Sequence, residues 1–358
     1  MNKIVTLTKE FISIKSNSEN TAELNEILEI ALAKLKGFTI ERFENKGAKS
    51  ALIYCAKKRP PKFRVILNGH LDVVPGKDYQ YFPKIKGDKL YGVGSMDMKG
   101  SVACLIMAFR EVATKVDYPL ALQLVTDEEI GGYNGTKYQI EKGVKADFVI
   151  AGESTGLQIA NRAKGILQVK ISTKGKAAHG AYPWRGKNAI WKMNKFLNSL
   201  LERYPIPSKQ DWVTTINLSK IETSNQAINK VPDDCVIWLD IRYIPKEAET
   251  IVSNIKGLLP KDFKLDILEK EPALFVDENN HYLKALQKVG EYVTKKKVVF
   301  YGAQGSSDAR HFTKAGIDGI EFGPTGDNIG SDNEAVSIKS LGQYYQILTS
   351  FLLSMSND

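Results

Sequence analysis

The fold is decided by the stretch from residue 63 to residue 153, which contains FRVILNGHLD (63–72), GSVACLIMAFREVAT (100–114), ALQLVTDEE (121–129) and ADFVIAGE (146–153). The first, third and fourth segments are apolar and β-like, whereas the second has a helical pattern. Strands that alternate with helices are typical of an α/β domain. This stretch therefore predicts an α/β fold with a mixed, largely parallel sheet.

The pattern changes near residue 164 and changes back after about residue 273. Between these points lie β-like runs from residue 165, at 214–224 and at 233–245, and helical patterns at 188–202 and 248–259. This order is typical of a small α+β, ferredoxin-like sandwich. We therefore predict a discontinuous catalytic domain, residues 1–163 and 274–358, interrupted by an inserted domain, residues 164–273.

Composition narrows the class of protein. The 358 residues favour two domains over one, and 43% hydrophobic with 25% charged residues is ordinary for a globular protein. No signal-peptide core, membrane span or C-x-x-C pair is present, so we expect a cytoplasmic protein without a membrane partner. The net charge of +9 is spread along the chain, which favours a solvated basic surface over a nucleic-acid footprint.

Four motifs place His or carboxylate residues where strands end or helices begin. They are His70 and Asp72 in NGHLDVVPG, Asp97 in LYGVGSMDMKGSVACL, Asp127 to Glu129 in LQLVTDEEIGG, and Glu153 in FVIAGES. Taken singly, each has a plainer interpretation: a structural histidine, a helix N-cap or a solvated loop. Ligands of open α/β sheets bind at the carboxyl ends of the strands, and crowded carboxylates there favour a cation. Together the motifs predict a divalent metal site, with zinc as the best candidate.

The order of these motifs, followed by GKAAHGAYPWRGKNAI, DIRY, GSSDARHF and FGP, resembles the M20 metallopeptidases. The likeness is to succinyl-diaminopimelate desuccinylase, acetylornithine deacetylase and aminoacylase relatives. It runs from about residue 11 to the last predicted helix. The resemblance implies a zinc-peptidase-like catalytic domain, an inserted lid or dimerisation domain, and a homodimer formed through that insert.

The resemblance also implies roles for the residues of the four motifs. His70 and Glu153 would bind one metal ion, Asp97 would bridge, and Glu129 would bind a second ion. Glu128 would be the general base that acts on a metal-activated water, and Asp72 would orient His70. A cis peptide bond between Asp97 and Met98 is expected at the bridge.

Further positions match the family's substrate-binding residues. His179, in the insert, would reach the partner subunit's site and stabilise the oxyanion. The residues matching positions that line the substrate carboxylate are Asn217, Arg242, Ser307 and Arg310. A guanidinium fork suits a carboxylate because it can donate two parallel hydrogen bonds.

The chain departs from the family pattern in the segment FGPTGDNIGSDNEAV. Gly330 stands where the family has a metal-binding histidine. Either Asp327 or Asp332 substitutes as an oxygen ligand, or water fills the position, or the second ion is weakly held. One or two Zn²⁺ ions per subunit are expected, with Co²⁺ or Mn²⁺ as alternatives.

The sequence thus predicts hydrolysis of an amide bond in an N-acyl amino acid or small peptide with a free carboxylate. The alternative is a degenerate homologue that binds such a molecule without efficient turnover, because of Gly330. The third candidate function is that of a nucleic-acid-binding or scaffold protein, and only the net charge favours it.

Overall fold

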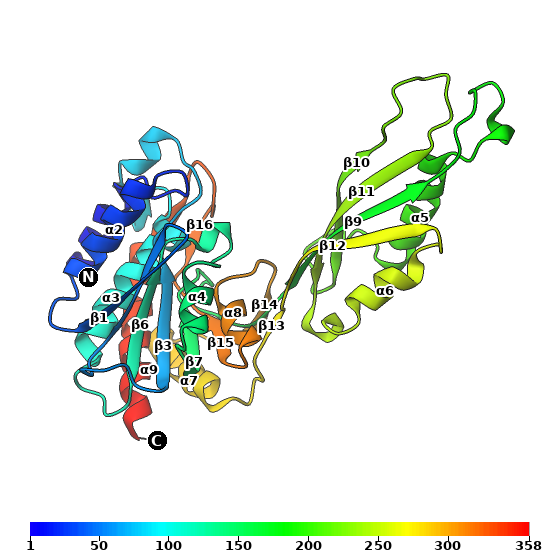
Figure 1. Cartoon of the computed structure of the whole chain (residues 1–358). Helices are drawn as coiled ribbons and strands as arrows, with labels where there is room; N and C mark the ends of the chain where they lie inside the picture. The colour runs from blue at the N-terminus through cyan, green and yellow to red at the C-terminus, as the bar shows by residue number, and fades with distance from the viewer. Residues whose placement is uncertain (358) are drawn as a thin grey trace. The chain divides into compact units, whose positions relative to one another are not determined.

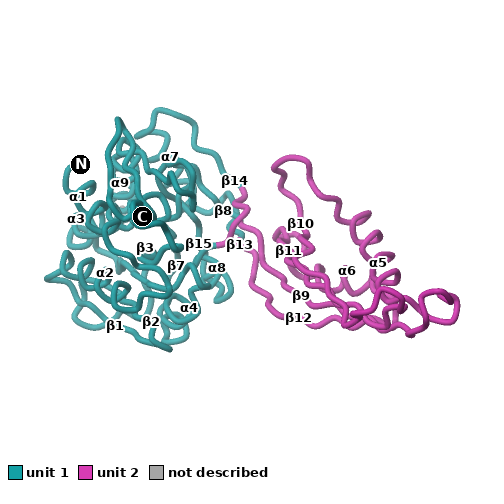
Figure 2. Tube along the Cα trace, turned by 90° about the horizontal axis from the view of Figure 1, so that it is seen from above, with its two compact units in different colours: residues 1–162, 275–301, 307–358 teal, residues 163–274, 302–306 magenta. Residues whose placement is uncertain are grey.

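The computed structural model describes residues 1–357, which form two compact units. The first unit contains Met1–Arg162, Phe275–Tyr301 and the chain from Ser307 onwards, and the second contains Ala163–Leu274 and Gly302–Ser306 (Figure 2). The roles expected of the sequence segments, a catalytic domain and an inserted lid, stay predictions. Among the described residues, no helix combines the length and the hydropathy that a membrane span needs.

The first unit is built on a mixed sheet of nine strands. Their order is β1 (Thr39–Asn45), β2 (Ala48–Tyr54), β6 (Leu120–Val125), β3 (Phe63–His70), β7 (Ala146–Ala151), β15 (Asp318–Glu321), β8 (Ile159–Ala163) and β13 (Leu274–Phe275), with β14 (Phe300–Ala303) paired to β8. The four central strands β6, β3, β7 and β15 are parallel, and the flanking pairs β1–β2, β2–β6 and β15–β8 are antiparallel. This arrangement confirms the predicted α/β fold.

Helices cover both faces of this sheet (Figure 1). One face packs against α1 (Asn2–Ile12), α2 (Thr21–Ala33), α3 (Gly100–Val112), α7 (His281–Thr294) and α9 (Ile338–Ser354), and the other against α4 (Thr136–Glu141) and α8 (Ala309–Lys314). Successive strand residues point to opposite faces, so Val65 and Leu67 join the first layer and Ile66 joins the second. Strands buried on both faces explain the nearly continuous apolar runs in the sequence.

A smaller sheet lies beside the main one and joins distant parts of the chain. Its order is β16 (Gly326–Asp327), β17 (Ala335–Ser337), β5 (Lys89–Tyr91) and β4 (Lys84–Lys86). Ala335 pairs with Tyr91, so the loop that contains Gly330 is anchored next to the segment leading to Asp97. Short helical turns are η1 (Asp78–Tyr81), η2 (Ser95–Lys99), η3 (Glu128–Ile130), η4 (Pro183–Arg185), η5 (Pro245–Glu247) and η6 (Met355–Asn357).

The second unit is an antiparallel sheet covered by two helices. The strands are β9 (Gly165–Lys174), β10 (Thr215–Glu222), β11 (Asp234–Tyr243) and β12 (Phe263–Glu271), in the order β10-β11-β9-β12, and the helices are α5 (Ala189–Arg203) and α6 (Ile251–Leu258). Residues of β11 alternate between buried and half-buried, because only one face of this sheet packs against the helices. The chain order β-α-β-β-α-β confirms the predicted ferredoxin-like topology.

Candidate active site

Three neighbouring parallel strands carry predicted site residues at their carboxyl ends. His70 is the last residue of β3, Asp127 to Glu129 follow β6, and Glu153 follows β7. Because β6, β3 and β7 are adjacent and parallel, these ends meet at one edge of the sheet. Asp97 reaches the same place from η2, the turn that precedes α3.

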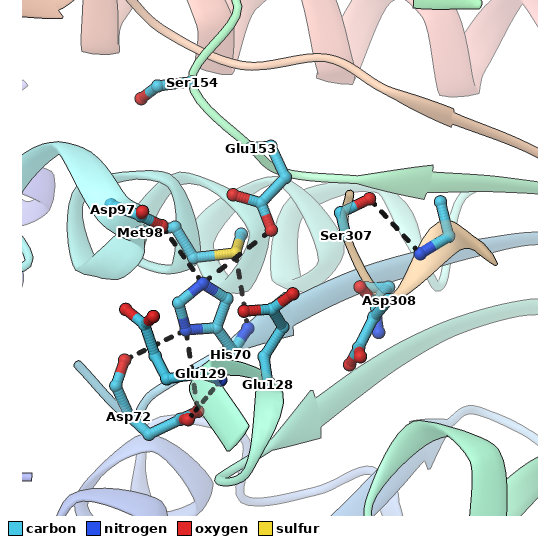
Figure 3. Close-up of polar contacts among 12 residues, drawn as sticks. His70, Asp72, Asp97, Met98, Glu128, Glu129, Glu153, Ser154, Ser307 and Asp308 are labelled. Atoms are coloured by element: carbon cyan, nitrogen blue, oxygen red, sulfur yellow. Dashed lines mark hydrogen bonds and ion pairs between the residues drawn. The ribbon is translucent and has the colours of Figure 1, made fainter. Parts of the chain in front are cut away.

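His70, Asp97 and Glu153 form a compact group (Figure 3). His70 Nε2 lies 3.2 Å from Asp97 Oδ1 and 3.7 Å from Glu153 Oε1. The ligand atoms of all three residues lie within 4.8 Å of one another. Because one imidazole and two carboxylates are ligands that zinc accepts, the group fits a divalent cation.

Asp72 fixes the orientation of the His70 ring. The Nδ1 atom of His70 lies 2.9 Å from the backbone oxygen of Asp72 and 3.5 Å from its Oδ1 atom. A carbonyl oxygen can only accept, so Nδ1 carries a hydrogen in this contact. In the neutral ring the Nε2 lone pair therefore faces Asp97 and Glu153, which is the tautomer that a metal ligand needs.

The carboxylates of the site are crowded and largely removed from water. Burial raises the pKa of Glu153 well above its ordinary value, and the Asp97 carboxylate adds to this rise. Burial also raises the pKa of Glu129 to about 7. Burial alone would lower the pKa of His70, but Asp72, Asp97 and Glu153 together raise it well above the ordinary value. A bound cation would offset the repulsion among these carboxylates.

Glu128 and Glu129 lie on η3, beside this group. Glu128 Oε1 is 3.7 Å from Arg310 Nη1, and the Glu128 side chain is drawn next to His70 in Figure 3. Burial is the main cause that raises the pKa of Glu128 well above its ordinary value. Glu129 accepts a 3.2 Å hydrogen bond from the backbone of Val74, and its own N–H donates to Asp72 Oδ2 at 2.9 Å.

The turn at Asp97 is held from several sides. The peptide bond between Asp97 and Met98 is cis, which confirms the expectation. Glu334 Oε1 accepts the N–H groups of Met96 and Asp97 at 2.8 and 3.1 Å. The Ser154 hydroxyl donates to the Met96 carbonyl at 2.7 Å. Several residues therefore aim the Asp97 carboxylate at His70.

Sequence reasoning did not assign a role to Glu334. Its side chain binds backbone N–H groups and lies outside the three-residue group, so no metal-ligand pattern points to it. One signal in the sequence could have indicated Glu334. Asn333 and Glu334 end the segment that contains Gly330, and the family pattern has Asn-Glu at these two positions.

The loop with Gly330 contributes no residue to the compact group. Asp327 pairs with Lys89 at 2.7 Å, and Asp332 forms an ion pair with Lys77. Gly330 has φ +65°, and a Cβ atom added there would meet no atom within 4 Å. The structure does not bring Asp327 or Asp332 into the group of His70, Asp97 and Glu153.

The predicted substrate-binding residues divide between the two units. Ser307 and Arg310 belong to the first unit, at the start of α8, and both are buried. Arg242 of β11 is 3.1 Å from Asp240 Oδ2, and Asn217 of β10 pairs with Asp240 across the sheet. His179 is in an exposed loop, where its Nδ1 accepts the N–H of Ala181 at 3.1 Å.

Two buried carboxylates behind Glu128 have a structural role that the sequence analysis did not predict. Asp127 Oδ2 accepts the N–H groups of Asn134 and Gly135 at 2.7 and 3.0 Å, and Asp308 accepts from the Thr136 hydroxyl at 2.5 Å. Asp127 lies in the acidic run and Asp308 in the SSDARHF motif. Neither position in the sequence indicates that the side chain holds the loop of residues 126–135 in place.

Comparisons with known proteins agree with this geometry. Residues 66–354 match the family described as "Peptidase family M20/M25/M40". The chain is 29% identical to a succinyl-diaminopimelate desuccinylase of Pelagibacter ubique (strain HTCC1062), over 97% of each chain. A tripeptidase of Staphylococcus aureus superposes with a TM-score of 0.80 at 19% identity, covering 100% of this chain and 99% of the tripeptidase.

A Bacillus subtilis protein described as a dinuclear metal-binding peptidase from the M20 family superposes with a TM-score of 0.72 at 13% identity, covering 99% and 98% of the two chains. At these identities the two structures support the fold alone. The family match extends over most of the chain and includes every residue of the four motifs. The chain therefore belongs to peptidase family M20/M25/M40 and is a metallohydrolase.

Proposed function

We propose that this protein hydrolyses an amide bond in an N-acyl amino acid or small peptide that carries a free carboxylate. The observation that carries this proposal is the compact group of His70, Asp97 and Glu153 with Glu128 beside it. A metal site next to a buried carboxyl group outside the ligand set is the arrangement that metal-assisted amide hydrolysis requires.

His70, Asp97 and Glu153 would hold the first metal ion, and Glu129 with Asp97 would hold a second. A bound Zn²⁺ ion would polarise the amide carbonyl and make water more acidic, and Co²⁺ or Mn²⁺ could supply the same chemistry. Because the Bacillus subtilis member of the same family is described as a dinuclear metal-binding peptidase, two ions are proposed for this chain as well. Gly330 supports weaker binding of the second metal ion, because glycine offers no side-chain ligand.

Glu128 would act as the general base. Its carboxylate would accept a proton from the attacking water and return it to the leaving amine. A raised pKa suits this task, because a stronger base takes the proton more readily, and burial supplies the rise. Arg310, 3.7 Å away, would keep part of the carboxyl population ionised.

Substrate recognition would centre on the free carboxylate. Arg310 and Ser307 lie in the same unit as the metal group, and Arg310 has the charge and shape to bind a carboxylate. The family resemblance assigns substrate recognition to Asn217, Arg242 and His179 as well, and this assignment is part of the proposal. In that role the second unit would be a lid and a dimerisation domain, and His179 would serve the partner subunit's site in a homodimer.

The likeness to the Pelagibacter protein makes N-succinyl amino acids the first substrates to test. A degenerate protein that binds these molecules without efficient turnover is the second candidate, which the ion pair of Asp332 with Lys77 favours. This pair occupies the side chain that could otherwise replace the missing ligand. A cytoplasmic location remains part of the proposal.

A hydrolysis screen tests the proposed function. N-acetyl, N-succinyl and dipeptide substrates are incubated with the purified chain and with Zn²⁺, Co²⁺ or Mn²⁺, and the free amine is quantified. We expect turnover of at least one class and none after chelation. Binding of the N-acyl compounds by calorimetry, with no amine released under any metal, would establish the degenerate alternative instead.

A further inference from the structure

The loop between β6 and α4, residues 126–135, carries Glu128 and packs against the first turn of α8. The carbonyl oxygen of Gly131 accepts two hydrogen bonds from that helix, one from Arg310 Nη2 at 2.7 Å and one from His311 Nε2 at 2.8 Å. Because a carbonyl oxygen only accepts, Nε2 of His311 carries a hydrogen here. Two buried donors on consecutive residues thus hold a single backbone atom.

The packing around this contact leaves little freedom. A Cβ atom on Gly132 would lie 1.9 Å from Asp308 Oδ1 and 3.2 Å from His311 Nε2, so any larger residue would require the Asp308 side chain to move. Gly132 also has φ +64°, a conformation that glycine adopts without strain. The Thr136 hydroxyl donates to Asp308 at 2.5 Å, which holds the far end of the loop to the same helix.

The Gly131 peptide is coupled directly to Glu128. Its N–H donates to the backbone oxygen of Glu128 at 2.7 Å and closes the η3 turn. On the opposite side, the N–H of Glu129 donates to Asp72 Oδ2 at 2.9 Å. The turn that carries Glu128 is therefore fixed between Asp72 on one side and α8 on the other.

We propose that His311 is a positioning residue that holds the Glu128 turn in place through the Gly131 carbonyl. The role rests on the proposed function, in which Glu128 is the base and Arg310 binds the substrate carboxylate. When a substrate engages Arg310, that guanidinium has fewer hydrogens left for Gly131. His311 is then the donor that keeps the turn from shifting. His311 itself does not touch the substrate.

Two variants separate this role from general stability. His311→Leu removes the donor at similar volume, whereas His311→Gln keeps an N–H group that can reach the carbonyl. Misplacement of a catalytic group by about 1 Å can cost about 100-fold in rate. We expect His311→Leu to lower kcat about 10- to 100-fold, with KM within about threefold and zinc content unchanged. His311→Gln should recover most of kcat.

Hydrogen–deuterium exchange of the peptide that covers residues 126–135 gives a readout that does not need turnover. Exchange should be faster in His311→Leu and close to wild type in His311→Gln. His281→Leu, on the exposed first residue of α7, is the matched control and should change neither measurement. His311→Asn, whose amide is too short to reach Gly131, replaces the leucine variant if that protein does not fold.

Wild-type kcat and wild-type exchange in folded His311→Leu would overturn the role of His311. Equal loss of kcat in the leucine and glutamine variants would overturn it as well, because a donor would then not be what matters. If the wild type hydrolyses none of the substrates, the proposed function fails while the exchange comparison still decides whether His311 holds the turn.

Discussion

At the scale of single residues, the site depends on how each side chain's surroundings set its charge. The backbone oxygen and the carboxylate of Asp72 hold Nδ1 of His70, which leaves Nε2 to face two acids. Glu128 lies outside that set, near Arg310. Under the proposed function, neighbouring carboxylates would have different tasks, because their charge partners differ from one position to the next.

Glu128→Gln should abolish most turnover without loss of metal. The amide keeps the size of the side chain but cannot accept a proton, and general-base catalysis contributes about 10²- to 10⁴-fold. We expect kcat to fall by a factor in this range while zinc content, measured by mass spectrometry, stays at the wild-type value. Glu141→Gln on the surface of α4 is the control. Loss of metal in Glu128→Gln would make Glu128 a ligand instead of the base.

Gly330→His should strengthen the binding of a second metal ion. The position is exposed, and a Cβ atom there meets nothing within 4 Å, so an imidazole has room. A positive φ disfavours most side chains by about 1–2 kcal/mol, although histidine tolerates it better than many. Gly330→Asn, with similar backbone tolerance and no imidazole, is the control.

Calorimetric titration with zinc reads out this substitution. The wild type should show one tight and one weak site. Gly330→His should tighten the weak site about tenfold or more, because a direct ligand should matter at least as much as a supporting group, whose loss costs about 10- to 100-fold. Activity should rise with it if the second ion limits turnover. Two equally tight sites in the wild type would show that another group already replaces the missing histidine.

At the scale of secondary-structure elements, the site is formed by turns that the surrounding elements hold in place. The η2 turn depends on Glu334, which the small sheet brings beside it through β17 and β5. The η3 turn depends on Asp72 and α8. Each turn places a carboxylate at the edge of the sheet, and each is supported by residues far away in the sequence.

Glu334→Ala should weaken metal binding by misplacing Asp97. The substitution leaves two backbone N–H groups without their acceptor, at a cost of about 1–3 kcal/mol for each that stays buried. We expect a lower Tm and at least about a tenfold loss of zinc affinity, the size typical for removal of a supporting group. Glu334→Gln keeps an acceptor oxygen and should lose less. Equal affinity in all three proteins would show that Glu334 does not position Asp97.

At the scale of the whole molecule, the buried acids link folding, pH and metal binding. Burial raises the pKa of Asp127, Glu129 and Glu321 to about 7, from ordinary values of 3.8, 4.5 and 4.5. Burial also lowers the pKa of Lys99 from 10.5 to about 7. Up to about pH 7 these carboxyl groups therefore stay protonated in the folded protein, whereas in the unfolded chain they lose their protons near pH 4. Lys99 behaves in the opposite way, because above about pH 7 it loses its proton in the folded protein and keeps it in the unfolded chain.

Without metal, stability should therefore decrease as pH rises from about 4 to 7, because the folded state binds more protons over that window. The contribution of Lys99 has the opposite sign: between about pH 7 and 10.5 this group alone makes stability increase with pH, whereas the raised pKa of His70 makes stability decrease above about pH 6.5. Zinc competes with protons for the ligands, so the zinc-induced rise in Tm should grow from pH 5 to pH 8. Tm measured at four pH values with and without zinc checks this. A rise independent of pH would contradict it.

Mixing two inactive chains tests the proposed homodimer. If His179 serves the partner subunit's site, a mixture of Glu128→Ala with His179→Ala should recover part of the wild-type activity, because one mixed site contains both groups. With random exchange, the recovered activity is at most about one quarter of wild type, since half of the dimers are mixed and each has one intact site. A fully active monomer by sedimentation would rule out the shared site.

The sequence by itself determined the fold class and predicted which side chains meet at the candidate site. Period-two and helical patterns predicted the α/β fold and the inserted α+β segment, because those patterns are local and repeat along each element. The strand-end motifs around His70, Asp97 and Glu153 predicted a metal site, because parallel strands bring their carboxyl ends to one edge whatever the intervening loops do.

Only the tertiary structure decided which residues support that site. Glu334 binds the η2 turn from 237 and 238 residues away in the sequence. His311 contacts Gly131 across 180 residues. The ion pair of Asp332 with Lys77 likewise depends on how a loop is anchored by a sheet formed from distant segments. Such contacts have no periodic pattern in the sequence, because they arise from the three-dimensional packing of elements and not from the conformation of any one of them.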